Sequence, residues 1–439
     1  MKSRKRFKAK TGFADKSPSA ERRLAADLLD GVILDGIPLN VLAGNPNFAN
    51  APPHEGAAAM RLVKDALRNL NRIDSVLDAF IKNPLRGRPK NSLRISVAEV
   101  FCQDSSPYAA VDQGVRLMRE RSGSGNLAGL ANAVLRKAAI DGKSHWDSAS
   151  GNKLPKWISE PVRAQFGEPV LNGIEIAHEK DAPLDLTPAN RNAAKALAGR
   201  LHGELLPTGS IRLQGKPKVS GLPGYCDGTW WVQDMSAAIP ARMLGDVSGL
   251  RILDMCAAPG GKTMQLAAVG ANVTSCDISG KRIERLRANL ERTRLHAEIV
   301  EMDALEWNRN EFFDAVIVDP PCTATGTIRR NPDIPFVGSG ERLGELVRLQ
   351  DQLLEKAFEL LKPGGVIVYS TCSILFEEGE SRADRIVSNR KLSTFAIDPE
   401  QLGLDRGWES CNGGIRLRPD YWAEIGGMDG FFSIMLKRA

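Results

Sequence analysis

The 439-residue sequence lacks any uninterrupted apolar run of about 18 residues, the length that a membrane-spanning helix requires. Its basic N-terminus is not followed by an apolar segment, so no secretory signal is expected. Its seven cysteines include no C-x-x-C pair and no cluster with histidine, which argues against a disulfide scaffold and a zinc site. These absences predict a cytoplasmic protein with no bound metal and no membrane partner.

Two nucleotide-binding signatures are also missing. The fingerprint G-x-G-x-x-G of dinucleotide-binding folds does not occur. The stretch DMCAAPGGKT, Asp254 to Thr263, ends like a phosphate-binding P-loop, but Cys256 stands where the first glycine of that motif is required. Pro259 also has no backbone N–H to offer a phosphate. A P-loop ATPase is therefore disfavoured.

The charge of the chain is modestly positive. The formal net charge is +6, and the first ten residues, MKSRKRFKAK, contain six lysines and arginines. Such a segment is typical of a flexible basic tail that contacts a polyanion. We therefore expect residues 1–19 to form a flexible basic tail and the partner to be a polyanion. We also expect the protein to be a monomer.

The pattern of apolar residues divides the rest of the chain. Residues 20–143 carry apolar side chains at helical spacing, as in ERRLAADLLDGVI, and predict an all-helical domain. The polar stretch DGKSHWDSASGNKLP predicts a linker. Residues 150–225 predict a small α+β subdomain, and residues 226–439 alternate strands and helices. That alternation predicts a doubly wound, Rossmann-like α/β sheet.

Acidic residues follow several strands of the predicted sheet. Asp254, Asp277, Asp303 and Asp319 stand at strand ends, where ligands of such sheets bind. An aspartate at this place commonly caps the next helix, but several carboxylates and one lysine in a single cleft suit a cationic ligand with a ribose diol. S-adenosylmethionine fits that description better than a triphosphate does.

Two cysteines occupy comparable positions. Cys322, in DPPC, and Cys372, in STCS, each follow a strand, whereas Cys102, Cys226, Cys276 and Cys411 are interpreted as small buried hydrophobes. Methylation of carbon 5 of cytosine requires a thiolate to add at carbon 6, helped by an acid near ring nitrogen 3. Asp319 is the candidate acid, and base-carbon chemistry is favoured over amino-group methylation.

Together, DMCAAPGGKT, VDPPCTATGTIRRNPDI and YSTCSI resemble the motifs of the Nol/Nop/Sun RNA cytosine-5 methyltransferases. TATGTIRRNPDI is most similar to the bacterial Sun branch, the small-subunit ribosomal RNA methyltransferase B group. LRISVAEVF, PYAAVDQGV and LAGLANAVLRKAA resemble a NusB-like domain that precedes the catalytic part in that branch. The resemblance implies a mixed seven-stranded methyltransferase sheet, a NusB-like RNA-binding domain, and methylation of cytidine in 16S ribosomal RNA.

The resemblance also implies roles for individual residues. Cys372 would attack cytosine, and Cys322 would assist release of the product, although DNA cytosine methylases use the cysteine of the P-C motif for attack. Arg329 and Arg330 would face RNA. The residues expected to bind the cofactor are Cys256, Ala257, Ala258, Pro259, Gly260, Gly261, Lys262, Asp277, Arg282, Asp303 and Asp319.

Two other functions stay open at this point. One is cytosine-5 methylation of transfer RNA, because the motifs do not name the target nucleotide. The other is an RNA-binding scaffold that keeps the fold without catalysis, which the presence of both cysteines and all the cleft acids disfavours.

Overall fold

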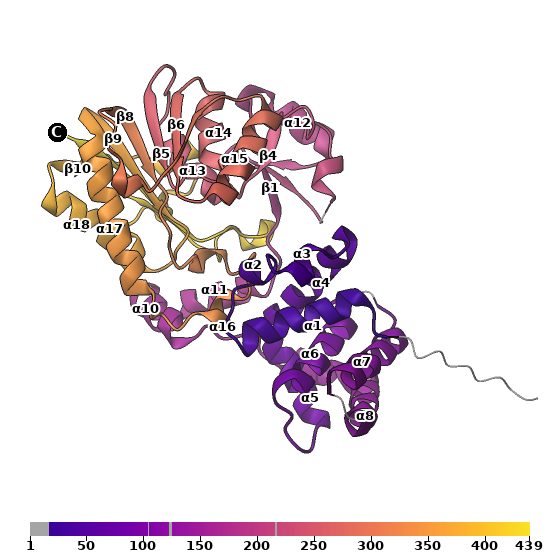
Figure 1. Ribbon diagram of the computed structural model, residues 1–439. Coiled ribbons are helices and arrows are strands. Elements are labelled where there is room, and N and C mark those ends of the chain that lie inside the picture. The colour runs from indigo at the N-terminus through magenta and orange to yellow at the C-terminus, as the bar shows by residue number, and fades with distance from the viewer. Residues whose placement is uncertain (1–16, 104, 123–124, 216) are drawn as a thin grey trace, which may run out of the picture. The chain divides into compact units, whose positions relative to one another are not determined.

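The computed structural model describes residues 17–103, 105–122, 125–215 and 217–439 and separates into two compact units, Met1–Asn152 and Lys153–Ala439 (Figure 1). Most of the predicted basic tail, residues 1–16, lies outside the described residues. The boundary between the units falls inside the segment predicted as a linker.

Among the described residues of the first unit, all regular secondary structure is helical, as the spacing of its apolar residues predicts. In α1 (Ala20–Ile33), Leu28, Leu29 and Val32 are buried, and α1 packs against α4 (Pro53–Arg68). The other helices are α2 (Leu39–Leu42), α3 (Pro46–Ala49), α5 (Leu70–Phe80), α6 (Gly87–Cys102), α7 (Pro107–Ser122), α8 (Gly125–Asp141) and α9 (Lys143–Ser148).

Helix α9 corrects the prediction of a linker, because it occupies six residues of the polar stretch. Its Trp146 is buried and stacks on Phe101 of α6, with ring centroids 4.8 Å apart. One large aromatic side chain therefore anchors a segment whose composition is otherwise that of a loop.

The second unit begins with α10 (Lys156–Phe166) and α11 (Glu168–His178), followed by a small antiparallel sheet of strand order β2-β3-β1-β4. Its strands are β1 (Leu184–Pro188), β2 (Glu204–Leu205), β3 (Ile211–Leu213) and β4 (Trp230–Val232), with α12 (Ala194–Leu201) between the first two. Because β4 pairs with β1, the small sheet extends past its predicted end at residue 225. The side chains of Trp230 and Trp231 are buried there.

A larger sheet follows, with strand order β10-β12-β9-β8-β5-β6-β7 among the described residues and β11 paired to β12 off that path. Strands β5 (Arg251–Met255), β6 (Asn272–Asp277), β7 (Glu298–Glu301), β8 (Phe313–Val318) and β9 (Leu361–Thr371) run parallel to one another. Strands β10 (Leu392–Thr394), β11 (Ile415–Leu417) and β12 (Phe431–Arg438) pair antiparallel. The expected mixed seven-stranded sheet of a Rossmann-like methyltransferase is confirmed.

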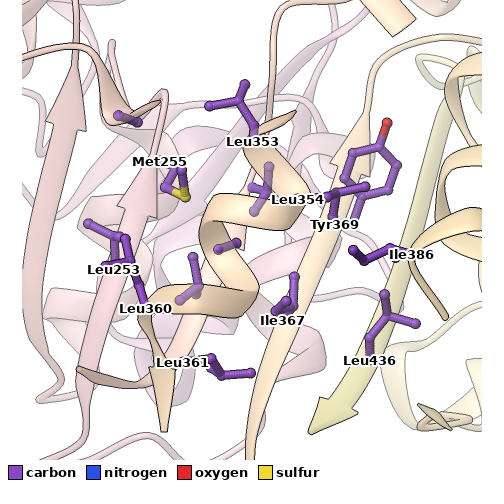
Figure 2. Close-up of a cluster of buried hydrophobic side chains, with 14 of the residues drawn as sticks. Leu253, Met255, Leu353, Leu354, Leu360, Leu361, Ile367, Tyr369, Ile386 and Leu436 are labelled. Atoms are coloured by element: carbon purple, nitrogen blue, oxygen red, sulfur yellow. The ribbon is translucent and has the colours of Figure 1, made fainter. Parts of the chain in front are cut away.

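Helices cover both faces of this sheet: α13 (Met235–Met243), α14 (Gly261–Ala268), α15 (Gly280–Thr293), α17 (Leu343–Leu360) and α18 (Glu380–Asn389). The short α16 (Ile334–Val337) packs instead against the cluster that contains residues of α10 and α11. Alternate strand residues point to opposite faces. Leu253 and Met255 pack with Leu353 and Leu354 of α17 (Figure 2), whereas Ile252 packs with residues of α13 and α14. Both faces of the parallel strands are therefore buried by helices. The carboxyl ends of the strands are the part of the sheet at which a ligand can bind.

Candidate active site

The predicted site residues gather where the parallel strands end. Met255 lies beside Val318 and Cys276, and Val318 lies beside Tyr369, so β5, β6, β8 and β9 end at comparable heights. The loop that begins at Cys256, and the segments that carry Asp319 and Cys372, consequently meet at one edge of the sheet.

The loop from Cys256 to Lys262 is held in a specific backbone conformation. Gly260 has φ of 101°, and a Cβ there would lie 2.2 Å from Leu286 Cδ1, so only glycine fits this position. Helix α15 secures the loop, because Asn289 Nδ2 donates to the carbonyl of Pro259 at 3.0 Å and Arg282 donates to that of Ala258. The loop is therefore shaped before any ligand arrives.

Asp277 and Asp303 each accept backbone hydrogen bonds. Asp277 is buried, and its carboxylate accepts from the N–H groups of Ala258 at 3.1 Å and Ser279 at 3.0 Å. It also pairs with Arg282 at 3.4 Å. Asp303 accepts from the N–H of Leu305 at 2.9 Å. These contacts order the strand ends, and the cofactor contacts expected of the same residues stay predictions.

Lys262 and Asp319 form the central ion pair of the site, with Nζ and Oδ2 2.5 Å apart. Burial alone would lower the pKa of Lys262, but the Asp319 carboxylate outweighs it and the pKa is raised. Asp254 and Cys372 add to this rise. Lys262 therefore stays protonated at neutral pH, and its ammonium also lies over the Phe431 ring at 5.7 Å from the centroid.

Asp254 lies deeper in the same region. Burial raises the pKa of Asp254 to about 6, although Thr263 Oγ1 donates to its Oδ2 at 2.6 Å. Its other oxygen, Oδ1, has no hydrogen-bond partner among the described residues. A single neutral hydroxyl does not compensate a buried carboxylate for the loss of water.

Cys322 and Cys372, 50 positions apart, are brought together with their sulfur atoms at 3.3 Å. Both side chains are partly buried. The hydrogen bond to Cys372, together with burial, raises the pKa of Cys322 well above its ordinary value. Cys322 therefore keeps its proton at neutral pH.

A buried carboxylate supports the Cys322 segment, and sequence analysis did not single it out. Glu378 accepts from the N–H of Thr323 at 2.9 Å and from Gln350 Nε2 at 3.0 Å, and the Thr323 hydroxyl also donates to it. The hydroxyls of Thr325 and Ser373 are 3.1 Å apart, which joins the segments that carry the two cysteines. Glu378 follows Cys372 by six positions and stands in the acidic run EEGE, so nothing in the sequence distinguishes it from its neighbours.

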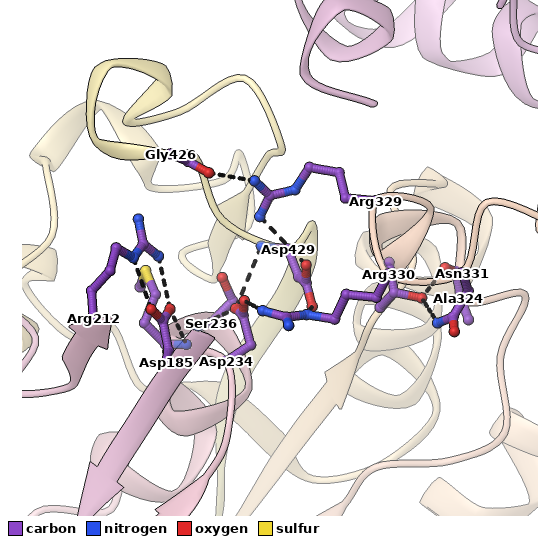
Figure 3. Close-up of polar contacts among 12 residues, drawn as sticks. Asp185, Arg212, Asp234, Ser236, Ala324, Arg329, Arg330, Asn331, Gly426 and Asp429 are labelled. Atoms are coloured by element: carbon purple, nitrogen blue, oxygen red, sulfur yellow. Dashed lines mark hydrogen bonds and ion pairs between the residues drawn. The ribbon is translucent and has the colours of Figure 1, made fainter. Parts of the chain in front are cut away.

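The two arginines expected to face RNA lie in a network with Asp234 and Asp429 (Figure 3). Arg329 is 1% exposed and pairs with Asp429 at 3.5 Å, so the expectation that it faces RNA is wrong. Arg330 is partly exposed, but its guanidinium pairs with Asp234 at 2.5 Å and Asp429 at 2.7 Å. Burial lowers the pKa of Arg329, whereas the two carboxylates outweigh burial and raise that of Arg330. An RNA contact by Arg330 stays a prediction.

The other cysteines differ in burial. Cys276 is buried as expected, and Cys102 is partly buried. Cys226 and Cys411 are exposed, which corrects their interpretation as buried hydrophobes. Both lie in turns rather than in strands or helices, so neither enters the core.

Metal-binding clusters and membrane-spanning helices are both absent from the described residues. No group of three or more histidine, cysteine, aspartate or glutamate side chains there has the arrangement of a metal site. None of the described helices combines the length and apolar character needed to cross a membrane.

Comparison with known proteins yields two family matches. The 16S rRNA methyltransferase RsmB/F family matches residues 241–437, and the NusB family matches residues 19–139. Ribosomal RNA small subunit methyltransferase B of Klebsiella pneumoniae strain 342 is 32% identical over 387 residues, covering 82% of this chain and 88% of that protein. The protein of the same name from Xanthomonas campestris pv. campestris is 30% identical over 441 residues, covering 96% and 97%. The crystal structure of PH0851 has a similar fold, with a TM-score of 0.71 at 20% identity, covering 96% of this chain and 100% of that one.

Proposed function

Because this chain belongs to the 16S rRNA methyltransferase RsmB/F family, we propose that it methylates carbon 5 of a cytidine in 16S ribosomal RNA with S-adenosylmethionine as donor. The observation that carries the proposal is the 3.3 Å contact of Cys322 and Cys372 beside the Lys262–Asp319 ion pair. Cytosine-5 chemistry needs one thiol to attack, a second group to remove a proton, and charged groups at the ring nitrogens. This edge of the sheet contains all three.

The residues at the strand ends suit the proposed cofactor by their chemistry. Carboxylates can accept hydrogen bonds from a ribose diol and attract a cationic sulfonium, and Asp277, Asp303 and Asp319 supply them. The loop from Cys256 to Lys262 lies between them with its glycines. When bound, the cofactor would supply the methyl group.

In the proposed reaction, the thiolate of Cys372 adds to carbon 6 and forms a sulfur–carbon bond. The electron pair of the double bond between carbons 5 and 6 then moves onto carbon 5 and, by conjugation, to nitrogen 3. The Lys262–Asp319 pair would lie near ring nitrogen 3, where its proton would stabilise the negative charge. After methyl transfer, a base must remove the proton from carbon 5, so that the bond to Cys372 breaks and its thiolate leaves. Cys322 is assigned to this release. Its thiol would first have to pass its own proton to solvent, and the thiolate could then take the proton from carbon 5, because a raised pKa makes it a strong base.

The first unit is proposed to add affinity for RNA. Its match to the NusB family supports this role, as does the basic segment that precedes it in the sequence. A ribosomal RNA substrate also supports the expected cytoplasmic location, and transfer RNA is the alternative substrate.

Two variants test the roles of the cysteines. Cys372→Ala should lose methyl transfer and form no covalent RNA adduct, whereas Cys322→Ala should accumulate an adduct that survives denaturing electrophoresis, because attack continues while release slows. Cys411→Ala is the matched control, since this cysteine is exposed in a turn, and it should behave as the wild type. An adduct that forms with Cys372→Ala and is lost with Cys322→Ala would reverse the two roles.

Bisulfite mapping of 16S ribosomal and transfer RNA from a deletion strain identifies the substrate. One cytidine of 16S ribosomal RNA should lose its methyl group and regain it when the wild-type gene, but not the Cys372→Ala gene, is returned. Loss in transfer RNA alone would favour the alternative substrate. A protein that transfers methyl groups to neither RNA would be the RNA-binding scaffold.

A further inference from the structure

We propose that a cavity beneath the small sheet binds a phosphate group. The cavity has a volume of about 120 Å³. Its lining includes Thr187 of β1, Trp231 of β4, Arg242 of α13, Gln265 of α14, and Arg191 from the segment that follows β1. A water molecule occupies about 30 Å³ in the liquid. The cavity thus has room for a phosphate group with a few waters.

Two arginines converge on this cavity without an acidic partner. A Cβ on Gly209 would lie 3.7 Å from Arg191 Nη2 and 3.9 Å from Arg242 Nη1, so both guanidinium groups approach the same point. Arg242 donates to the carbonyl of Thr208 and to Ser210 Oγ, both of which are neutral. Within the described part of the chain, Arg191 forms no hydrogen bond or ion pair, and no carboxylate pairs with Arg242.

Two like charges held close together are unfavourable unless an anion lies between them. Burial, more than the charge of Arg191, lowers the pKa of Arg242 to about 9, so an anion beside it would favour its charged form. The fork of donors on each guanidinium matches the oxygens of a phosphate. An anion at this place would relieve the repulsion and use donors that otherwise lack partners.

A buried hydroxyl provides an independent sign of a ligand. Thr187 lines the cavity, is 3% exposed, and its Oγ1 has no hydrogen-bond partner among the described residues. Buried polar atoms are nearly always hydrogen-bonded, because an unpaired one has lost its contacts with water and gained nothing in return. A phosphate oxygen or its hydrating water would satisfy this hydroxyl.

The cavity is separate from the site of the two cysteines. Helix α14 begins at Gly261, beside the loop at the carboxyl edge, and the cavity is lined by residues 265–269 at its other end. The exposed side chain of Arg191 stands at the cavity, so a phosphate on a larger molecule can be reached from outside. We favour a backbone phosphate of RNA as the source, which rests on the proposed function, whereas the phosphate chemistry does not depend on it.

Arg191→Glu and Arg200→Glu make a matched pair of variants. Both arginines are exposed and both changes alter the net charge equally, but Arg200 does not line the cavity. Inorganic phosphate, compared with chloride at equal ionic strength, should raise the Tm of the wild-type protein and of Arg200→Glu. Arg191→Glu should bind phosphate about tenfold more weakly or worse, the equivalent of one charge-assisted hydrogen bond. Thr187→Val, which keeps the shape and the charge, should show a smaller loss.

RNA binding, measured without S-adenosylmethionine at several salt concentrations, identifies the source of the phosphate. The slope of log K against log salt should fall in magnitude by about 1 for Arg191→Glu relative to Arg200→Glu. An unchanged slope with lost phosphate binding would overturn the RNA source and favour a small phosphorylated molecule. The proposal would be overturned if phosphate left the Tm of the wild-type protein unchanged. It would also be overturned if Arg191→Glu and Arg200→Glu bound phosphate equally well. Because these readouts need no methyl transfer, they stand apart from the cysteine tests.

Discussion

Asp254 carries a proton in the folded protein under conditions where an exposed aspartate does not. Its pKa is raised to about 6 by burial, while an aspartate of an unfolded chain titrates near about 3.9. As pH rises from about 4 to about 6, the unfolded state gains charge first, so this residue's contribution to stability is lost across that window. The loss amounts to about 1.4 kcal/mol for each pH unit of difference between the two pKa values.

Asp254→Asn should remove this dependence. The stability of the variant relative to the wild type, from urea unfolding, should rise between about pH 4 and 6 and then level off. Asp314→Asn is a control of opposite sign, because the hydrogen bond from Lys362 lowers the pKa of Asp314, so its contribution is lost as pH falls. A constant difference between Asp254→Asn and the wild type would contradict the assignment.

Sequence analysis identified single residues best where a motif surrounds them. Cys322 and Cys372 stand at strand ends in recognisable motifs, and the structure brings their sulfur atoms to 3.3 Å. Arg329 and Arg330 also stand in a motif. The carboxylates with which they form ion pairs, Asp234 and Asp429, are about a hundred positions away on either side. Local patterns contain no information on such partners, so exposure was the natural and incorrect expectation for Arg329.

At the scale of elements, periodicity predicted the long helices and the parallel strands, because each buries a regular set of side chains. It did not predict β4 or α9, which are short and depend on one or two tryptophans. A three-residue strand is too short to show alternation. The position of β4 depends on its pairing with β1, which the sequence alone does not reveal.

Helix α9 yields a test of this kind of anchoring. Trp146→Ala should destabilise the first unit by about 3–5 kcal/mol, because it removes a large buried ring that stacks on Phe101. Ile140→Ala on α8 is the control, since that side chain is 78% exposed and its loss should change stability by no more than about 0.5 kcal/mol. Equal effects in urea unfolding would mean that α9 is a linker after all.

At the scale of the molecule, buried ion pairs join the small sheet to the large one. Asp185 pairs with Arg212 at 2.7 Å inside the small sheet, and Arg212 also donates to the carbonyl of Ile425 at 3.0 Å. Asp234 and Asp429 hold Arg330 from the segment that follows Cys322. The second unit therefore contains two sheets that share one polar interior (Figure 3).

Asp429→Ala tests how much this interior depends on complete pairing. Removing one carboxylate leaves buried arginine charge uncompensated, so we expect a loss of about 3–5 kcal/mol. The control Glu355→Ala removes a partner of Arg390 from a more exposed pair and should cost about 1 kcal/mol or less. If the two variants lose the same free energy of unfolding, the network does not couple the two sheets. Asp429→Asn, which keeps the shape, should fall between them.

The same network ties residues that are synthesised at very different times. The backbone N–H of Asp429 donates to Asp234 across 195 positions, and the contact of Arg212 with Ile425 spans 213. While the chain is being made, β1, β3 and the Cys322 segment leave the ribosome long before their partners exist. Closing such long loops is slow and must precede any gain from the contacts. The contacts that Asp429 makes with Asp234 and Arg330 therefore cannot form in a nascent chain until residue 429 has emerged.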